Sequence, residues 1–182
     1  SGMWRTDIIR KFRLRFGDYI IFEDTIWAID YFHHIQSVSI ISPRACHQYG
    51  YHYYYPWQGR EYGLVTEKLF RAKKDLLERM CSLFNKLDAP DLFEDINRAI
   101  SSDIMVSLMN MYRGQNTNVR SRRERIRILN LVGTGKVEME LGHKPFVWLY
   151  GRICQWKHKV WADAILLLMA YLLDFKLCFL RR

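Results

Sequence analysis

The stretch that decides the fold is LVTEKLFRAKKDLLERMCSLFNKL at 64–87, followed after Asp88-Ala89 by PDLFEDINRAISSDIMVSLMNMY at 90–112. In both segments the apolar side chains recur every three or four residues, which is the spacing of one helical face. The stripes are Val65, Leu69, Ala72, Leu76, Met80, Leu83 and Leu87, then Leu92, Ile96, Ile100, Ile104, Leu108 and Met111. Asp88 and Pro90 are typical of a helix start. The pattern predicts helices over about 64–87 and 90–112.

A third helical pattern begins after Pro145 and predicts a helix over about 146–175. Its stripe is Phe146, Leu149, Ile153, Trp156, Val160, Ala164, Leu167 and Tyr171. The second half of this segment is apolar on all sides, so we expect it at the centre of the core. Its uninterrupted apolar part, Ile165–Leu173, has nine residues. A membrane-spanning helix needs ~20, so we expect no membrane segment.

Two further segments alternate between polar and apolar residues, which is typical of half-buried strands. In KFRLRF at 11–16 the charged and apolar side chains point to opposite faces, and Gly17-Asp18 follows as a turn, which predicts a hairpin over about 11–22. Residues 125–132 and 136–141 flank Gly133-Thr134-Gly135 and predict a second hairpin over about 123–141. Two hairpins packed on three longer helices make an α+β fold.

Length and composition favour one domain. A chain of 182 residues that is 49% hydrophobic fits a single compact core over 3–182, and Ser1-Gly2 before Met3 is interpreted as a tag remnant. The four cysteines are widely spaced without a CxxC pair, which excludes a dense disulfide scaffold. We find no secretory signal and expect an intracellular protein, in the cytoplasm or the nucleus, with reduced thiols.

The net charge of +9 is divided into blocks of one sign. Residues 1–16, 113–127 and 144–159 carry +4, +5 and +4, whereas residues 18–36 and 87–112 carry −4 each. Such blocks create extended fields instead of neutral pairs. A positive field attracts polyanions, because neutralised phosphates release counterions.

These blocks predict a basic protein that binds nucleic acid, with RNA or single-stranded DNA preferred. If both hairpins belong to one sheet, their cations form one positive surface for phosphates. The predicted phosphate-binding residues are Lys11, Arg13, Arg15, Arg113, Arg120, Arg122, Arg123, Arg125 and Arg127. Arginine dominates residues 113–127, and its planar group suits phosphates and stacks on bases.

An aromatic segment strengthens this hypothesis. Seven tyrosine and tryptophan residues lie within 49–62, beside Arg60. Tyr53, Tyr55 and Trp57 are the predicted base-stacking residues, since exposed rings beside positive charge bind single strands. Two alternatives stay open: the rings belong to a strand that covers the core, or they form a protein–protein contact.

The alternative function is a small interaction or inhibitor protein whose basic, tyrosine-rich face docks an acidic protein partner. A third interpretation rests on Arg152 and His158, whose spacing is similar to the R-x(4–6)-H element of HEPN-type ribonucleases. That resemblance implies RNA cleavage without a metal, in which the histidine acts on the 2′-hydroxyl and the arginine steadies the phosphate. On one regular helix, the two side chains would lie about 120° apart.

The sequence contains no motif that names an enzyme or a cofactor, and we expect a non-enzymatic protein without one. The weak metal-ligand candidates are His33, His34, Cys46 and His47, but their spacing matches neither a zinc finger nor a zincin.

Overall fold

The protein is all-helical wherever its structure is described. The computed structural model describes residues 4–17, 22–37, 65–115, 117–134, 137–141 and 145–179. In these ranges it contains no strand, only a single parallel bridge between Val65 and Thr117. The helices are α1 (Thr6–Phe12), α2 (Glu23–Phe32), α3 (Glu67–Lys86), α4 (Pro90–Tyr112), α5 (Arg122–Gly133), α6 (Pro145–Cys154) and α7 (Lys159–Phe179). The α+β prediction is therefore wrong.

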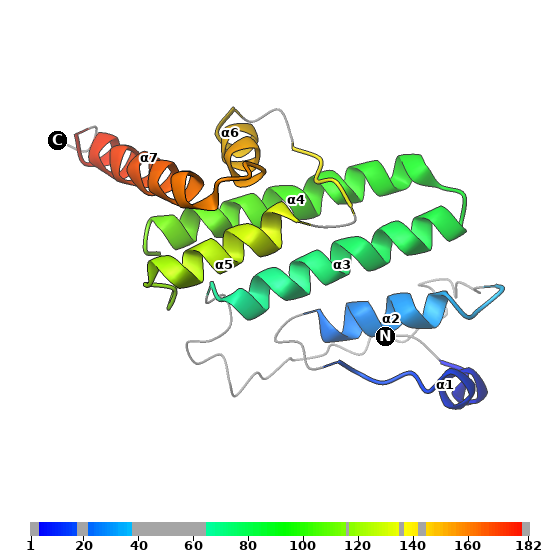
Figure 1. Cartoon of the computed structure of the whole chain (residues 1–182). Coiled ribbons are helices and arrows are strands. Elements are labelled where there is room, and N and C mark those ends of the chain that lie inside the picture. Colours follow the sequence, from blue (N-terminus) through cyan, green and yellow to red (C-terminus); the bar gives the residue numbers. More distant parts are fainter. Residues whose placement is uncertain are drawn as a thin grey trace.

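Helices α3 and α4 form the long hairpin at the centre of the molecule (Figure 1). The Thr66 hydroxyl accepts a hydrogen bond from the Leu69 amide at 3.3 Å and caps α3, while Pro90 opens α4. The predicted helices over 64–87 and 90–112 are confirmed. A long run of apolar residues with the helical period of about 3.6 outweighs the conformational preferences of individual residues. The α4 stripe is buried only from Ile104 onward; Leu92 at its start is 62% exposed.

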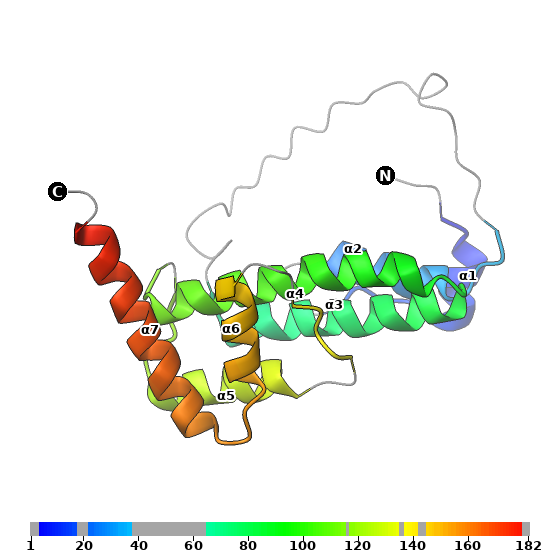
Figure 2. The same cartoon turned by 90° about the horizontal axis from the view of Figure 1, so that it is seen from above.

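Helix α3 contacts α2, α4 and α5, and α6 and α7 pack on α4 and α5 (Figures 1 and 2). The main core lies among α3 to α7, around the fully buried Phe70, Leu108 and Tyr150. A smaller apolar cluster, including Ile26 and Ile29, joins α2 to α3. No described helix combines the length and the hydropathy required to cross a lipid bilayer.

The predicted hairpin over 11–22 is replaced by the helix α1, a left-handed residue at Arg13 and an irregular segment up to residue 17. Residues 18–21 lie outside the described part of the chain. The alternation of 11–16 serves ring packing on α2 instead of a sheet: Phe12 stacks on His34 and Phe16 on Trp27. Six alternating residues cannot form a stable strand without a neighbour to pair their backbone groups.

The predicted hairpin over 123–141 is also wrong, because residues 122–133 form α5. Ser121 and Glu124 make a capping box: the Glu124 amide donates to the Ser121 hydroxyl, and the Ser121 amide donates to the Glu124 carboxylate, each at 3.2 Å. The Ser-x-x-Glu spacing was visible in the sequence as a helix start. It outweighs the alternation that follows, in which Ile128, Leu129 and Val132 become one buried helical face.

The predicted helix over 146–175 is two helices, α6 and α7, with a break at residues 155–158. Beyond the break, Ala162, Leu166 and Ala170 face the core. Several members of the predicted core stripe are instead exposed: Leu149, Trp156, Val160, Leu167 and Tyr171. The Phe146 side chain lies outside the described part. A break of four residues changes the register, so a stripe read across it cannot stay on one face.

The end of α5 lies close to the end of α6, and Gly133 permits this contact. A Cβ atom at Gly133 would overlap the carbonyl oxygen of Cys154 and the Lys159 ammonium group that donates to it. A glycine-to-alanine change in an open helix gains about 1 kcal/mol. At Gly133 the new methyl group would instead have to displace the backbone carbonyl of Cys154.

We predict that Gly133→Ala lowers the free energy of unfolding by about 1–3 kcal/mol, the cost of overpacking a filled site. Urea denaturation measures this change. The matched control is Asn130→Ala, at an exposed position on the same helix, which we expect to stay within about 0.5 kcal/mol of the parent. A Gly133→Ala variant more stable than the parent would show that the two helix ends are not in contact.

Candidate functional site

The arginine-rich segment 113–127 folds into the end of α4, a connection and the first half of α5. Its only acid, Glu124, is held by the Ser121 cap, and these hydrogen bonds keep the pKa of Glu124 below its ordinary value. The carboxylate also lies in the first turn of α5, where it complements the helix dipole. Glu124 is therefore committed to the helix start.

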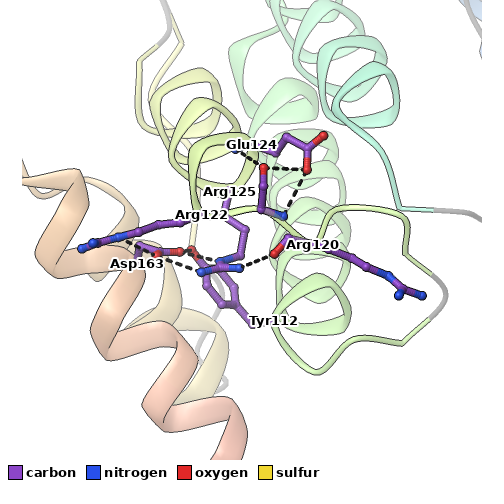
Figure 3. Close-up of polar contacts among 7 residues, drawn as sticks. Tyr112, Arg120, Arg122, Glu124, Arg125 and Asp163 are labelled. Carbon is purple, nitrogen blue, oxygen red and sulfur yellow. Dashed lines mark hydrogen bonds and ion pairs between the residues drawn. The ribbon is translucent and has the colours of Figure 1, made fainter.

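One of the predicted phosphate ligands, Arg125, is half-buried and makes an internal ion pair with Asp163 of α7 (Figure 3). Its Nε donates to Asp163 Oδ1 at 2.8 Å and its Nη2 donates to Oδ2 at 3.2 Å. The same Asp163 oxygen, Oδ1, accepts a hydrogen bond from the Tyr112 hydroxyl at 2.9 Å. Arg122 approaches Oδ2 at 3.7 Å. We call Tyr112, Arg122, Arg125 and Asp163 the Asp163 cluster.

The carboxylate of the Asp163 cluster lies in the core, because Asp163 is 2% exposed, whereas Arg122 approaches it from the surface. The hydrogen bond to Asp163 raises the pKa of Arg125, so this guanidinium stays charged. Burial and the neighbouring carboxylate raise the pKa of Tyr112, so its hydroxyl remains a donor. A buried carboxylate with two donors satisfies the hydrogen-bonding needs of the site and ties α4, α5 and α7 together. The Asp163 cluster therefore stabilises the fold.

Sequence reasoning missed this cluster. Asp163 is the only acid between residues 144 and 173, within a strongly apolar helix. A lone carboxylate in such a place has to be buried with a partner or face solvent. That is the signal that could have found it, although the sequence does not say which arginine is the partner.

The remaining arginines of the segment are accessible. Arg120, Arg122, Arg123 and Arg127 are exposed around the start of α5, as Figure 3 shows for Arg120, whose guanidinium points away from the cluster. Arg113 is half-buried at the end of α4. The exposed four have no acid beside them in the sequence except the capped Glu124. They make up what we call the α5 arginine edge.

The second predicted set, Lys11, Arg13 and Arg15, lies in and directly after α1, the helix that Figures 1 and 2 show at the opposite end of the molecule from the start of α5. Phe12 stacks on His34 of the α2 end, where Lys86 at the end of α3 donates to the carbonyl of His33. The α5 start lies instead beside the beginning of α3, since the Thr117 hydroxyl donates to the Val65 carbonyl at 2.9 Å. The twenty residues of α3 span about 30 Å between these ends. The expected joint surface of both blocks is not formed.

A group of exposed acidic side chains lies around the α3–α4 connection, at the end of α3 away from the α5 arginine edge (Figure 1). The α3–α4 connection and the first turns of α4 carry the exposed acids Asp88, Asp91, Glu94 and Asp95. Arg98 pairs with Glu94 at 2.7 Å and with Asp95 at 3.2 Å. The end of the molecule away from the α5 arginine edge therefore carries charges of both signs, these acids and the Lys11–Arg15 block.

The predicted stacking residues Tyr53, Tyr55 and Trp57, together with Arg60, lie outside the described residues. So do the metal candidates Cys46 and His47.

Their partners in that prediction, His33 and His34, are described. The His34 ring stacks on Phe12 at 3.8 Å, and burial and Lys86 lower the pKa of His33. No group of three or more His, Cys, Asp or Glu side chains suited to a metal ion occurs in the described ranges.

Arg152 lies in the last turn of α6, and His158 is the last residue of the break before α7. The Arg152 guanidinium lies over the Trp148 ring at 5.6 Å, and the His158 carbonyl accepts hydrogen bonds from the Trp161 and Ala162 amides of α7, each at 3.1 Å. Both side chains are exposed. The angle expected for a continuous helix no longer applies, because the helix is interrupted between them. The ribonuclease interpretation stays a prediction.

Comparison with known proteins supplies no relative: no family model matches the chain, and no curated protein or solved structure is significantly similar to it.

We predict that Arg125→Met lowers the free energy of unfolding by about 3–5 kcal/mol, because it leaves the Asp163 carboxylate buried without its main partner. Arg123→Met, at an exposed neighbour, is the control and should change stability by less than about 0.5 kcal/mol. Adding Asp163→Leu to Arg125→Met should recover part of the loss. Thermal and urea unfolding measure all three, and equal effects of the two single changes would contradict the pairing.

Burial raises the pKa of the Cys154 thiol to about 12, against the opposing charge of Lys159. We predict that iodoacetamide at about pH 8 modifies the partly exposed Cys81 in the native protein and leaves Cys154 intact until denaturant is added. Peptide mass spectrometry reads both sites in one sample. Native modification of Cys154 at the rate of Cys81 would contradict its burial at the end of α6, against α5.

Proposed function

We propose that the protein binds nucleic acid, RNA or single-stranded DNA, through the α5 arginine edge. The observation that carries this proposal is the exposure of Arg120, Arg122, Arg123 and Arg127 around one helix start whose single acid is held in a cap. Guanidinium groups match phosphate geometry and stay charged at every accessible pH. Neutralising a few phosphates there releases counterions and supports micromolar, sequence-independent binding.

The separation of charge along the molecule supports the same proposal. The exposed acids Asp88, Asp91, Glu94 and Asp95 lie about one α3 length, ~30 Å, from the α5 arginine edge. That distance exceeds the ~8 Å Debye length at physiological salt, so the acids do not screen the arginines. A polyanion approaching the molecule is then steered to the α5 end and repelled from the α3–α4 connection.

Arg125 takes no part in phosphate binding under this proposal, because its guanidinium is engaged by Asp163 and by the Arg120 carbonyl at 3.0 Å. Its role is to hold α5 on α7 so that the exposed arginines stay in place. Lys11, Arg13 and Arg15, at the far end, are not expected to share a bound strand of a few nucleotides with the α5 arginine edge.

We predict that replacing Arg120, Arg123 and Arg127 together by Gln makes the log–log slope of affinity against salt less negative by about 2, since each lost single-strand phosphate contact contributes ~0.7. Fluorescence anisotropy measures the slope with labelled oligouridylate and oligothymidylate of about 20 nucleotides, which distinguishes RNA from DNA. Arg122 is left unchanged because it approaches Asp163.

The matched control removes the same charge from the other end, by replacing Lys11, Arg13 and Arg15 with Gln. We expect it to change the slope by less than one phosphate contact, about 0.7. Equal losses in both triple variants would show that net charge acts without a site. A salt-independent affinity would overturn nucleic-acid binding. Capture of one stoichiometric acidic protein that survives nuclease treatment would favour the interaction-protein alternative instead.

A further inference from the structure

Between residues 160 and 173, helix α7 buries its one charged side chain and exposes several large apolar side chains. Between residues 160 and 173 the only charged side chain is Asp163, which is buried with Arg125. The side turned away from the core consists of large apolar residues about half exposed or more. They are Val160 at 50%, Trp161 at 67%, Leu167 at 46%, Leu168 at 58%, Tyr171 at 71% and Leu172 at 56%. These six residues, with the exposed Ala164 among them, form what we call the α7 face.

The α7 face lies at the edge of the molecule. Figures 1 and 2 show α4, α5 and α6 on one side of α7 and no described element on the other. The inward side is complete, because Ala162, Leu166 and Ala170 are buried against these neighbours. The core is therefore packed without the apolar residues on the outward side of α7.

The spacing on the α7 face is that of a helix–helix seam. Val160, Ala164, Leu167 and Tyr171 follow one another at intervals of four, three and four residues. This is the repeat that places side chains along a two-helix contact. The small residue Ala164 within the seam allows a second helix to come close. The same residues formed the core stripe predicted from the sequence, and in the single chain they face solvent.

The exposed area fits an interface. With about 200 Å² for an aromatic side chain and about 120 Å² for an aliphatic one, the six residues expose roughly 500 Å² of apolar surface. This is at the upper end of the largest apolar patch on a typical monomer. Two copies that bring the same face together bury about 1,000 Å² in total, the size at which a specific interface becomes credible. No charge on this part of α7 is buried unpaired in the process.

We infer that the α7 face pairs with the α7 face of a second copy of this chain. A two-fold axis makes one surface self-complementary, so a single apolar seam suffices for both partners. A lipid surface fits less well. Helices that lie on bilayers set Lys and Arg against their apolar side, and α7 has neither between residues 160 and 173.

Sedimentation equilibrium of the full chain, from about 1 to 100 μM with a reductant present, tests this pairing. We expect a mass of twice the single-chain 22.0 kDa at high concentration. Leu167→Glu places a carboxylate in the seam and should raise the dissociation constant at least about 30-fold, as for a central interface residue. Because Leu167 is exposed in the single chain, far-UV circular dichroism should show an unchanged fold.

The matched control is Leu92→Glu, which places the same charge on a comparably exposed leucine, 62% exposed, in the first turns of α4. It should leave the dissociation constant within about threefold, as for a surface change outside the interface. A parent that stays monomeric throughout overturns the pairing. So does equal weakening by both changes, or a dimer that Leu167→Glu leaves intact.

A lipid occupant has its own readout. If the monomeric parent floats with phosphatidylserine–phosphatidylcholine vesicles and Leu167→Glu abolishes the flotation, the face binds lipid and the pairing is overturned. The nucleic-acid measurement uses different variants on a different helix, so each proposal can fail without the other.

Discussion

The Asp163 carboxylate is the constraint on which the arrangement of the C-terminal half depends. It lies in the core at 2% exposure and is held by the fork of Arg125 and by the Tyr112 hydroxyl. A buried charge without partners costs several kcal/mol, so this helix has to bring the carboxylate to an arginine. That requirement sets the rotation of α7 about its axis and joins it to α4 and α5. The apolar residues on the side away from the buried Ala162, Leu166 and Ala170 are turned outward as a consequence.

The same ion pair divides the arginines of segment 113–127 into two kinds. Arg125 belongs to the core, whereas Arg120, Arg123 and Arg127 remain accessible around the α5 start. The capping box holds Glu124 at the helix start, and as the single acid among six arginines it leaves the segment strongly positive. The helix cap and the buried ion pair thus leave a cationic edge at one end of the molecule, separated by the length of α3 from the acids around the α3–α4 connection.

Predictions from the sequence succeeded where the pattern was long and failed where it was short. The stripes of α3 and α4 each extend over more than five turns, and local sequence preferences rarely outweigh a helical pattern of that length. The alternations at 11–16 and 125–132 are six and eight residues long and are compatible with helix or irregular structure once ring stacking or a capping box intervenes. At the candidate site, the sequence identified the arginine-rich block. It could not distinguish Arg125 from its neighbours, because its partner Asp163 is 38 residues away.

By itself the sequence determined the two central helices, the blocks of opposite charge and the strongly apolar C-terminal segment, since all three are properties of neighbouring residues. Only the tertiary structure decided that the cationic blocks lie at opposite ends, that the last helix breaks at residues 155–158, and which side of α7 faces inward. These outcomes depend on contacts between distant residues. A helix that is apolar all round can pack with any of its sides against the core. In α7, the buried pair of Asp163 and Arg125 determines which side faces inward.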